Sequence, residues 1–153
     1  MTRAAETYPA PVATPPVHLT ASGVVVAPDG AVALLLRHPQ FDRWGPLGGH
    51  VEGAETLLEA VRREVAEESG LTDVRVLAPA LDVTQHLVPC GRAEEATHRD
   101  HLFAVVADPE LPLRPESGAS LAWFAVDALP EPAVPGLGAW VSAAARVARG
   151  ARS

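Results

Sequence analysis

Several residue types are absent from this chain of 153 residues, and each absence excludes a mechanism. The sequence contains no lysine, isoleucine or asparagine. Without lysine, neither Schiff-base catalysis nor a Walker-type phosphate-binding lysine is available. Cys90 is the only cysteine, so an intrachain disulfide and a multi-cysteine zinc site are both excluded. A reducing, cytoplasmic location is therefore expected.

Long apolar runs are also missing from the sequence. Residues 1–17 contain no run of signal-peptide length, and no later segment approaches the roughly 18 apolar residues of a membrane span. Export and membrane insertion are therefore not expected.

Positive charge is scarce as well, because 12 basic residues face 19 acidic ones and the formal net charge is -7. A protein that binds the nucleic acid backbone needs a dense positive surface, so we expect no nucleic acid partner. A nucleotide-sized anion can still bind where a metal ion or a local arginine cluster neutralises it.

The chain is long enough for a single domain with a real core. Residues 1–17 contain four prolines and predict an extended, flexible arm, followed by a domain over residues 18–153. Apolar runs on both sides of Asp29-Gly30 predict a β-hairpin. Further patterns predict a mixed α/β domain of layered type: a long loop over 38–55, a helix over 56–69, strands over 74–89, 101–108 and 120–130, a polar loop over 90–100, and a C-terminal helix over 134–152.

The stretch from Gly48 to Leu71 contains six glutamates, which raises the question of whether they bind a cation. Thr56 and Glu59 have capping-box spacing, and Gly70 is suited to end the helix. Helical geometry places Glu64, Glu67 and Glu68 on one arc at the border of the apolar stripe. That stripe consists of Leu57, Leu58, Val61 and Val65.

Three like charges at this spacing repel one another, and withdrawing them from water raises the cost further. Carboxylate oxygens suit Mg²⁺ or Mn²⁺, so we interpret Glu64, Glu67 and Glu68 as metal ligands. Gly48 and Gly49 allow the preceding backbone to approach the helix closely. Arg63 is placed to bind an acidic residue of that loop such as Glu55. The alternative is an acidic amphipathic helix whose glutamates pair with arginines elsewhere.

The spacing of these residues resembles the Nudix box, G-x5-E-x7-R-E-U-x-E-E-x-G-U, in which U is bulky and apolar. Gly49, Glu55, the run Arg63-Glu64-Val65, the pair Glu67-Glu68, and Gly70-Leu71 match every specified position. The approach through Trp44, Gly48 and Gly49 and the later segment 122–130 are similar to this family too. The resemblance covers about residues 18 to 148.

The resemblance implies an α/β/α sandwich around a mixed β-sheet, with the box forming a loop-helix-loop. It also implies that Glu64, Glu67 and Glu68 bind catalytic Mg²⁺, with the Gly48 carbonyl contributing and Glu55 and Arg63 forming an orienting ion pair. The usual reaction of the family is hydrolysis of a nucleoside diphosphate linked to another group X, which releases a nucleoside monophosphate and phosphorylated X. In it, a metal-activated water attacks phosphorus.

The general base and the substrate contacts stay open at this point. Glu64 is the candidate base within the box, while Glu94, Glu95 and Glu116 are candidates on predicted loops. Candidate contacts to phosphate or leaving group are Arg37, Arg43, His50, His98, Arg99 and Asp100. His86 and His101 fall within strand-like runs and suit packing as well as function.

The substrate itself is not selected by any motif. Aromatic residues that could stack on a base are Phe41, Trp44, Phe103, Trp123 and Phe124, of which Trp123 and Phe124 are expected to fill the core. Nucleotide sugars or ADP-ribose-like compounds, nucleoside triphosphates and non-nucleoside diphosphates are alternatives. A non-catalytic nucleotide-binding sensor and a homodimer are further options.

Overall fold

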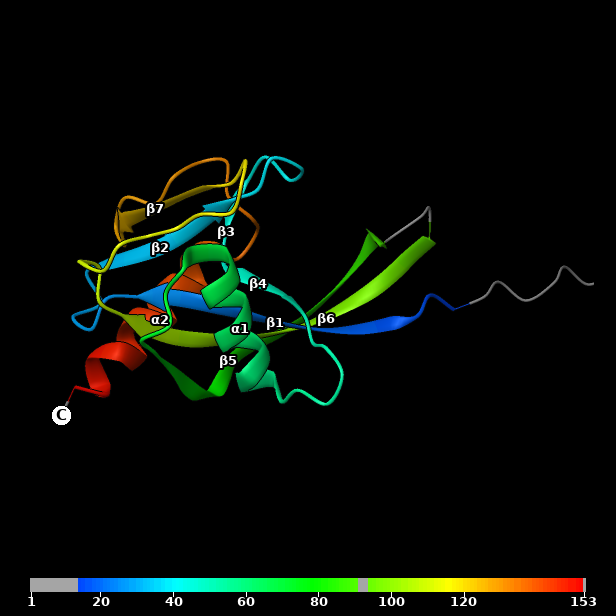
Figure 1. Ribbon diagram of the computed structural model, residues 1–153, viewed down its shortest axis with the longest axis horizontal. Coiled ribbons are helices and arrows are strands. Elements are labelled where there is room, and N and C mark those ends of the chain that lie inside the picture. The colour runs from blue at the N-terminus through cyan, green and yellow to red at the C-terminus, as the bar shows by residue number, and fades with distance from the viewer. Residues whose placement is uncertain (1–13, 91–93, 153) are drawn as a thin grey trace, which may run out of the picture.

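A seven-stranded sheet and two helices form the part of the chain that the computed structural model describes, residues 14–90 and 94–152. In chain order the elements are β1 (Val17–Val26), β2 (Val32–Arg37), β3 (Trp44–Gly45), β4 (Leu47–His50), α1 (Leu57–Ser69), β5 (Val74–Cys90), β6 (Glu94–Ala107), β7 (Ser120–Ala125) and α2 (Leu137–Gly150). Figure 1 shows the end of β5 and the starts of β6 and β1 extending beyond the helices.

The sheet is mixed. Its main order is β3-β2-β1-β6-β5, while β4 pairs with β1 and β7 pairs with β2. Strands β1 and β6 run parallel over ten residue pairs, and the other pairings are antiparallel. The hairpin predicted around Asp29-Gly30 is confirmed as β1 and β2, with Gly30 at φ 71° in the turn.

Alternation along the central strands divides the core into two layers. In β1, Val25 joins the cluster that contains Val61 and Val65 of α1. Val24 points the other way, into the cluster that contains Val141 of α2. Because successive side chains of a strand point to opposite faces, each helix covers one face of the sheet. The predicted α/β/α sandwich is therefore confirmed.

Both helices were predicted in the right places. The box helix runs from Leu57 to Ser69, with Thr56 as its N-cap and Gly70 at φ 79° as its C-cap. The arginines at 146 and 149 in α2, and Arg152 just after it, are exposed, as expected. Neither helix, within the described ranges, has the length and hydropathy to cross a membrane.

The predicted polar loop over 90–100 is wrong, because β6 already begins at Glu94. The polar residues of β6 have strand partners on both sides. His98, for example, pairs with His18 of β1 and with His86 of β5. These long-range hydrogen bonds stabilise a strand whose local composition favours a loop.

The predicted boundary between the arm and the domain stays a prediction. Residues 1–13 lie outside the described part of the chain, and Val17 already begins β1.

Candidate active site

The helix α1 begins with reciprocal capping bonds that fix its start next to the box loop. The Glu59 amide donates to Thr56 Oγ1 at 3.2 Å, and the Thr56 amide donates to Glu59 Oε2 at 3.1 Å. At the other end, the Gly70 amide donates to the Ala66 carbonyl at 2.8 Å. With both ends set, the buried face of α1 lies against β1 and β4, and its acidic residues meet the backbone of β4.

Arg63 is the centre of the polar contacts between the helix and the loop. Its Nε and Nη2 donate to the two carboxylate oxygens of Glu55 at 2.8 and 3.0 Å. Nη1 donates to Glu64 Oε1 at 2.8 Å and to Glu67 Oε2 at 3.2 Å. Nη2 also donates to the His50 carbonyl at 2.8 Å. One guanidinium therefore orients two glutamates of the helix and joins them to the end of β4.

Glu64 and Glu68 are withdrawn from water, whereas Glu67 is not. The Glu64 side chain is 13% exposed and that of Glu67 is 51% exposed, while Glu68 as a residue is only 8% exposed. Burial raises the pKa of Glu64, although Arg63 opposes the shift. Burial also raises the pKa of Glu68 to about 8, opposed by the Gly48 amide and reinforced by the charges of nearby glutamates.

The two glycines before His50 bring the backbone against these carboxylates. The Gly48 amide donates to Glu68 Oε1 at 2.6 Å. A β-carbon at Gly49 would lie 2.4 Å from Glu64 Oε1, and one at Gly48 would lie 2.5 Å from the Ala21 carbonyl. Glycine at position 49 therefore leaves room for the Glu64 carboxylate of the helix, and glycine at position 48 leaves room for the backbone of the neighbouring strand β1.

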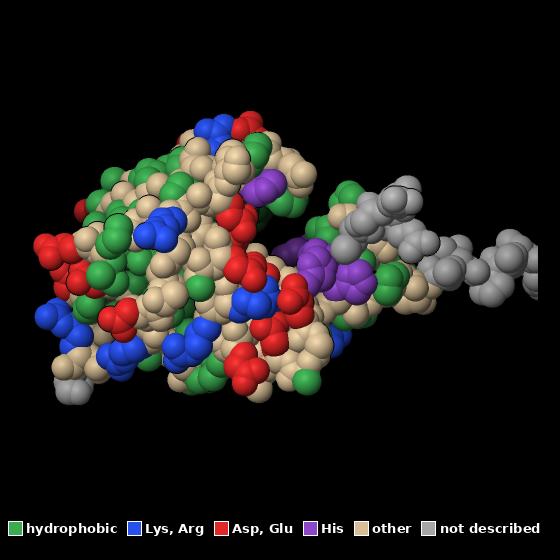
Figure 2. Space-filling view, viewed as in Figure 1, with side chains coloured by type: hydrophobic (Ala, Val, Ile, Leu, Met, Phe, Trp, Pro, Cys, Tyr) green, Lys and Arg blue, Asp and Glu red, His purple; other side chains and the backbone are tan. Residues whose placement is uncertain are grey.

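A cavity of about 360 Å³ opens beside Glu68. Glu68, Gly48, Glu116 and Arg43 are among the residues that line it. The charge of Glu116 contributes to the raised pKa of Glu68, so the two carboxylates interact across this space. Figure 2 shows acidic side chains gathered around a basic one, with histidines beside them.

A second cavity, of about 300 Å³, shares Phe41 and Gly48 with the first and continues toward β6. Its polar lining consists of Thr20, Ser22, His50, His86, His98 and Asp100. Asp100 accepts from Thr20 Oγ1 at 3.0 Å, and Ser22 Oγ lies 2.9 Å from each carboxylate oxygen. Burial and the neighbouring histidines lower the pKa of His98. The candidate site is thus a cleft with carboxylates at one end and imidazoles at the other.

Some predicted contacts lie elsewhere. Arg37 is paired with Asp42, an acidic residue of the loop that follows β2. Glu95 and Arg99 lie in β6 rather than in a loop, on the face opposite His98 and Asp100, and line neither cavity. The side chain of Glu94 lies outside the described residues.

The aromatic residues divide in the same way. Phe41 is 70% exposed and lines both cavities. The others pack in the two core clusters: Trp44, Phe103, Trp123 and Phe124. The expectation that Trp123 and Phe124 fill the core is confirmed.

Sequence reasoning missed Thr20 and Ser22 of the cleft, and also His18, which lies on the same face of β1. Their signal was present, because polar residues at alternate positions of a strand share one face. Nothing local indicated that this face meets His98 and Asp100, which are about 80 positions away along the chain.

The carboxylate end of the cleft suits a divalent cation. Within the described part of the chain, Glu68 has no salt-bridge partner, although it is buried and next to other acids. Oxygen donors of this kind fit Mg²⁺ or Mn²⁺. The carboxylates of Glu64, Glu67 and Glu68 do not converge on a single cation position in this structure, because Arg63 binds those of Glu64 and Glu67.

The fold and this site can now be compared with known proteins. A NUDIX hydrolase of Clostridium perfringens aligns with 85% of this chain and 97% of its own, at 23% identity and a TM-score of 0.65. A MutT NUDIX hydrolase of Burkholderia pseudomallei aligns with 82% and 96%, at 26% identity and 0.57. The E. coli dihydroneopterin triphosphate pyrophosphohydrolase aligns with 81% and 92%, at 17% identity and 0.65. These structures share the layered fold described above.

The NUDIX domain model matches residues 16–144, and the chain therefore belongs to the Nudix family. The predicted membership of the Nudix family is confirmed. The chain is 38% identical over 114 residues to RNA pyrophosphohydrolases of two Caulobacter vibrioides strains, an alignment that covers 72% of this chain. It spans 58% of the length of these relatives.

Proposed function

We propose that this protein is a Mg²⁺-dependent pyrophosphohydrolase that cleaves a diphosphate linkage in a nucleoside diphosphate derivative by attack of water on phosphorus. The observation that carries the proposal is the pair of carboxylates withdrawn from water, Glu64 and Glu68, of which Glu68 lines a cavity sized for a small ligand. Such a pair needs a cation to stay ionised, and a diphosphate needs a cation to accept a nucleophile.

In this proposal Glu64, Glu67 and Glu68 bind Mg²⁺, with the Gly48 carbonyl as a further ligand and Mn²⁺ as a substitute. When bound, Mg²⁺ neutralises phosphate oxygens and lowers the pKa of a water nucleophile. Arg63 orients Glu64 and is itself held by the bidentate contact with Glu55. Arg43, which lines the cavity, is placed to attract a phosphate.

Glu116 is our proposed general base, in preference to Glu64. The Glu64 Oε1 atom already accepts from Arg63, whereas Glu116 lines the cavity and is not part of α1. The pH-rate profile decides between them. Glu116→Gln should remove the acidic limb of that profile with little change in Mg²⁺ affinity, whereas Glu64→Gln should weaken Mg²⁺ binding first.

The substrate is best identified with a product-resolved assay over a broad panel. The panel contains nucleotide sugars, ADP-ribose, nucleoside triphosphates and prenyl diphosphates. It also contains 5′-triphosphorylated RNA, because of the name of the Caulobacter relatives, and dihydroneopterin triphosphate, because of the name of the E. coli structure. The terminal phosphates of an RNA need only a small site, so the net negative charge does not oppose this substrate.

The panel is read by ³¹P NMR in ¹⁸O-labelled water, which reports both the product and the attacked phosphorus. Activity that requires Mg²⁺ or Mn²⁺ and stops with a chelator supports the proposal. Calorimetric binding of a nucleotide without turnover in either metal would instead indicate a non-catalytic sensor. No turnover and no binding across the panel would refute both functions.

Two further expectations belong to this proposal. A cytoplasmic location follows from the single cysteine, and fractionation of the producing cells tests it. A homodimer is the expected assembly, and the exposed apolar side chains of Val17, Leu19, Val83 and Leu87 on β1 and β5 are the surface we expect a second copy to cover. A monomeric mass in sedimentation at micromolar concentration would contradict the dimer.

A further inference from the structure

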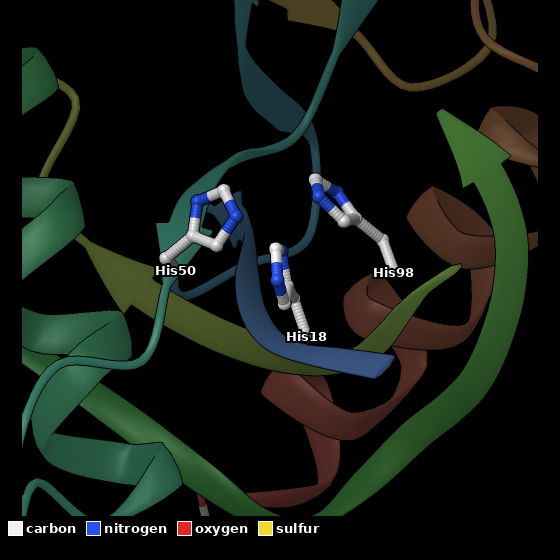
Figure 3. A group of neighbouring side chains, drawn as sticks. All are labelled: His18, His50 and His98. Atoms are coloured by element: carbon white, nitrogen blue, oxygen red, sulfur yellow. The ribbon is translucent and has the colours of Figure 1, made fainter. Parts of the chain in front are cut away.

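We propose that His18, His50 and His98 form a binding site for one transition-metal ion of the zinc class, separate from the glutamates of α1. Their candidate ligand nitrogens all lie within 4.8 Å of one another, the one such group among residues 14–90 and 94–152. Figure 3 shows the three imidazoles gathered around a shared space, each from a different strand. The site does not depend on the proposed hydrolysis.

The spacing of the rings fits one shared ion. The ring centroids are 4.7 Å apart for His50 and His98, 5.5 Å for His18 and His50, and 5.9 Å for His18 and His98. Three imidazoles on a tetrahedral zinc, with Zn–N near 2.0 Å, place their ring centroids about 5 Å apart. Small side-chain rotations therefore suffice to bring the nitrogens to bonding distance.

The sheet register holds these side chains in place. His18 of β1 is the direct partner of His98 of β6 in the parallel pairing, so the two share one face. His50 is the last residue of β4 and pairs with Thr20, which is the next residue of β1 after His18 on that face. The His50 carbonyl is fixed by Arg63 Nη2 at 2.8 Å. Ligands carried on paired strands are pre-positioned, which lowers the entropic cost of binding.

The chemistry of the group selects a borderline metal rather than Mg²⁺. Imidazole nitrogen suits zinc, cobalt, nickel and copper, whereas Mg²⁺ requires oxygen ligands. The Nε2 atom of His98 is buried and lacks a hydrogen-bond partner in the structure, a cost that coordination would remove. Asp100 lines the same cavity as His50 and His98, and its carboxylate adds negative charge close to the three histidines.

The trio supplies three ligands and leaves one tetrahedral position for a water or an anion. Two of the ligands, His50 and His98, line the cavity of about 300 Å³ together with Gly48 and Gly49. A bound ion would therefore place positive charge in the cleft, at the end opposite Glu68. The nearby His86, partner of His98 in β5, also lines this cavity.

Cobalt binding tests the site directly, because four-coordinate Co²⁺ absorbs visible light strongly. Untagged full-length protein, freed of metal by a chelator and dialysed, is titrated with Co²⁺ in excess Mg²⁺, which occupies the oxygen ligands. We expect one equivalent to bind with the four-coordinate spectrum and to be displaced by Zn²⁺. His18→Ala, His50→Ala and His98→Ala should each weaken binding by more than about 100-fold, beyond the 10–100-fold lost with an outer-shell partner.

Two controls make the result specific. His38→Ala removes a histidine outside the trio, and Glu68→Gln alters the carboxylate end, and both should keep the cobalt spectrum. Circular dichroism checks that each variant folds. If alanine at the half-buried positions of His18 or His98 prevents folding, His50→Ala decides the test, because His50 is exposed. Absence of the four-coordinate spectrum, or unchanged affinity in His50→Ala, would overturn the proposal.

Discussion

Gly49 lies so close to Glu64 that a β-carbon at position 49 would be 2.4 Å from Glu64 Oε1. The strand β4 and the helix α1 therefore meet through a backbone atom and a carboxylate, with no room for a side chain between them. Any residue larger than glycine must push Glu64 away from its contact with Arg63.

Gly49→Ala should reduce Mg²⁺-dependent turnover by about 100-fold, because a displacement on the order of 1 Å in a catalytic group has an effect of that size. The kcat and the Mg²⁺ affinity on the best substrate measure it. Gly138→Ala in α2 is the matched control, since a β-carbon there meets nothing within 4 Å. Full activity of Gly49→Ala would show that the position of Glu64 is not critical.

Glu68→Gln should lower kcat by at least about 100-fold, more than the 10–100-fold expected for an outer-shell partner of a metal. Glu67→Gln should also lower turnover. Glu59→Gln serves as the control: it removes the same charge from the same helix at an exposed position, and glutamine preserves the capping box. A ligand role for Glu68 is excluded if its glutamine variant retains Mg²⁺ affinity and turnover.

Stability of the metal-free protein should fall as pH rises toward 8. In the folded state burial raises the pKa of Glu68 from 4.5 to about 8, so folding favours the protonated form. The contribution of Glu68 to the stability of the folded state is fully present below 4.5, the pKa in the unfolded chain, and is lost as pH rises through about 8. Thermal melts in a chelator between pH 4.5 and 9 measure it, and Glu68→Gln should flatten this part of the profile. Equal pH slopes in the two proteins would contradict the burial of this charge.

Arg63→Lys should lower turnover by about 10 to 100-fold, the range found for groups that orient metal ligands. A lysine keeps the charge but cannot reproduce the planar fork that contacts Glu55, Glu64 and His50. The matched control is Arg62→Lys, whose parent side chain is exposed and donates to the Val74 carbonyl at 3.0 Å. The kinetic constants and Mg²⁺ affinity of both variants provide the comparison.

Much of the carboxylate end could be predicted because its signals are local. The capping pair Thr56 and Glu59, the C-cap Gly70 and the apolar period between them specify one helix and the face it buries. Glu64 and Glu68 lie on that border by helical geometry alone, and the burial of Glu68 in the structure agrees with it.

The other end of the cleft depends on pairings between distant segments. Residues 94–100 are polar and predicted a loop, yet they form a strand because β1 and β5 supply partners on both sides. That pairing turns Arg99 away from the cleft and His98 toward it, since a strand alternates its faces.

The sequence by itself thus determined the helix, the placement of its glutamates and the family, because side-chain spacing within one helix encodes them. Only the tertiary structure decided which residues share the cleft with them. His18, His50 and His98 come together through sheet register, and register is set by long-range backbone hydrogen bonds rather than by local spacing.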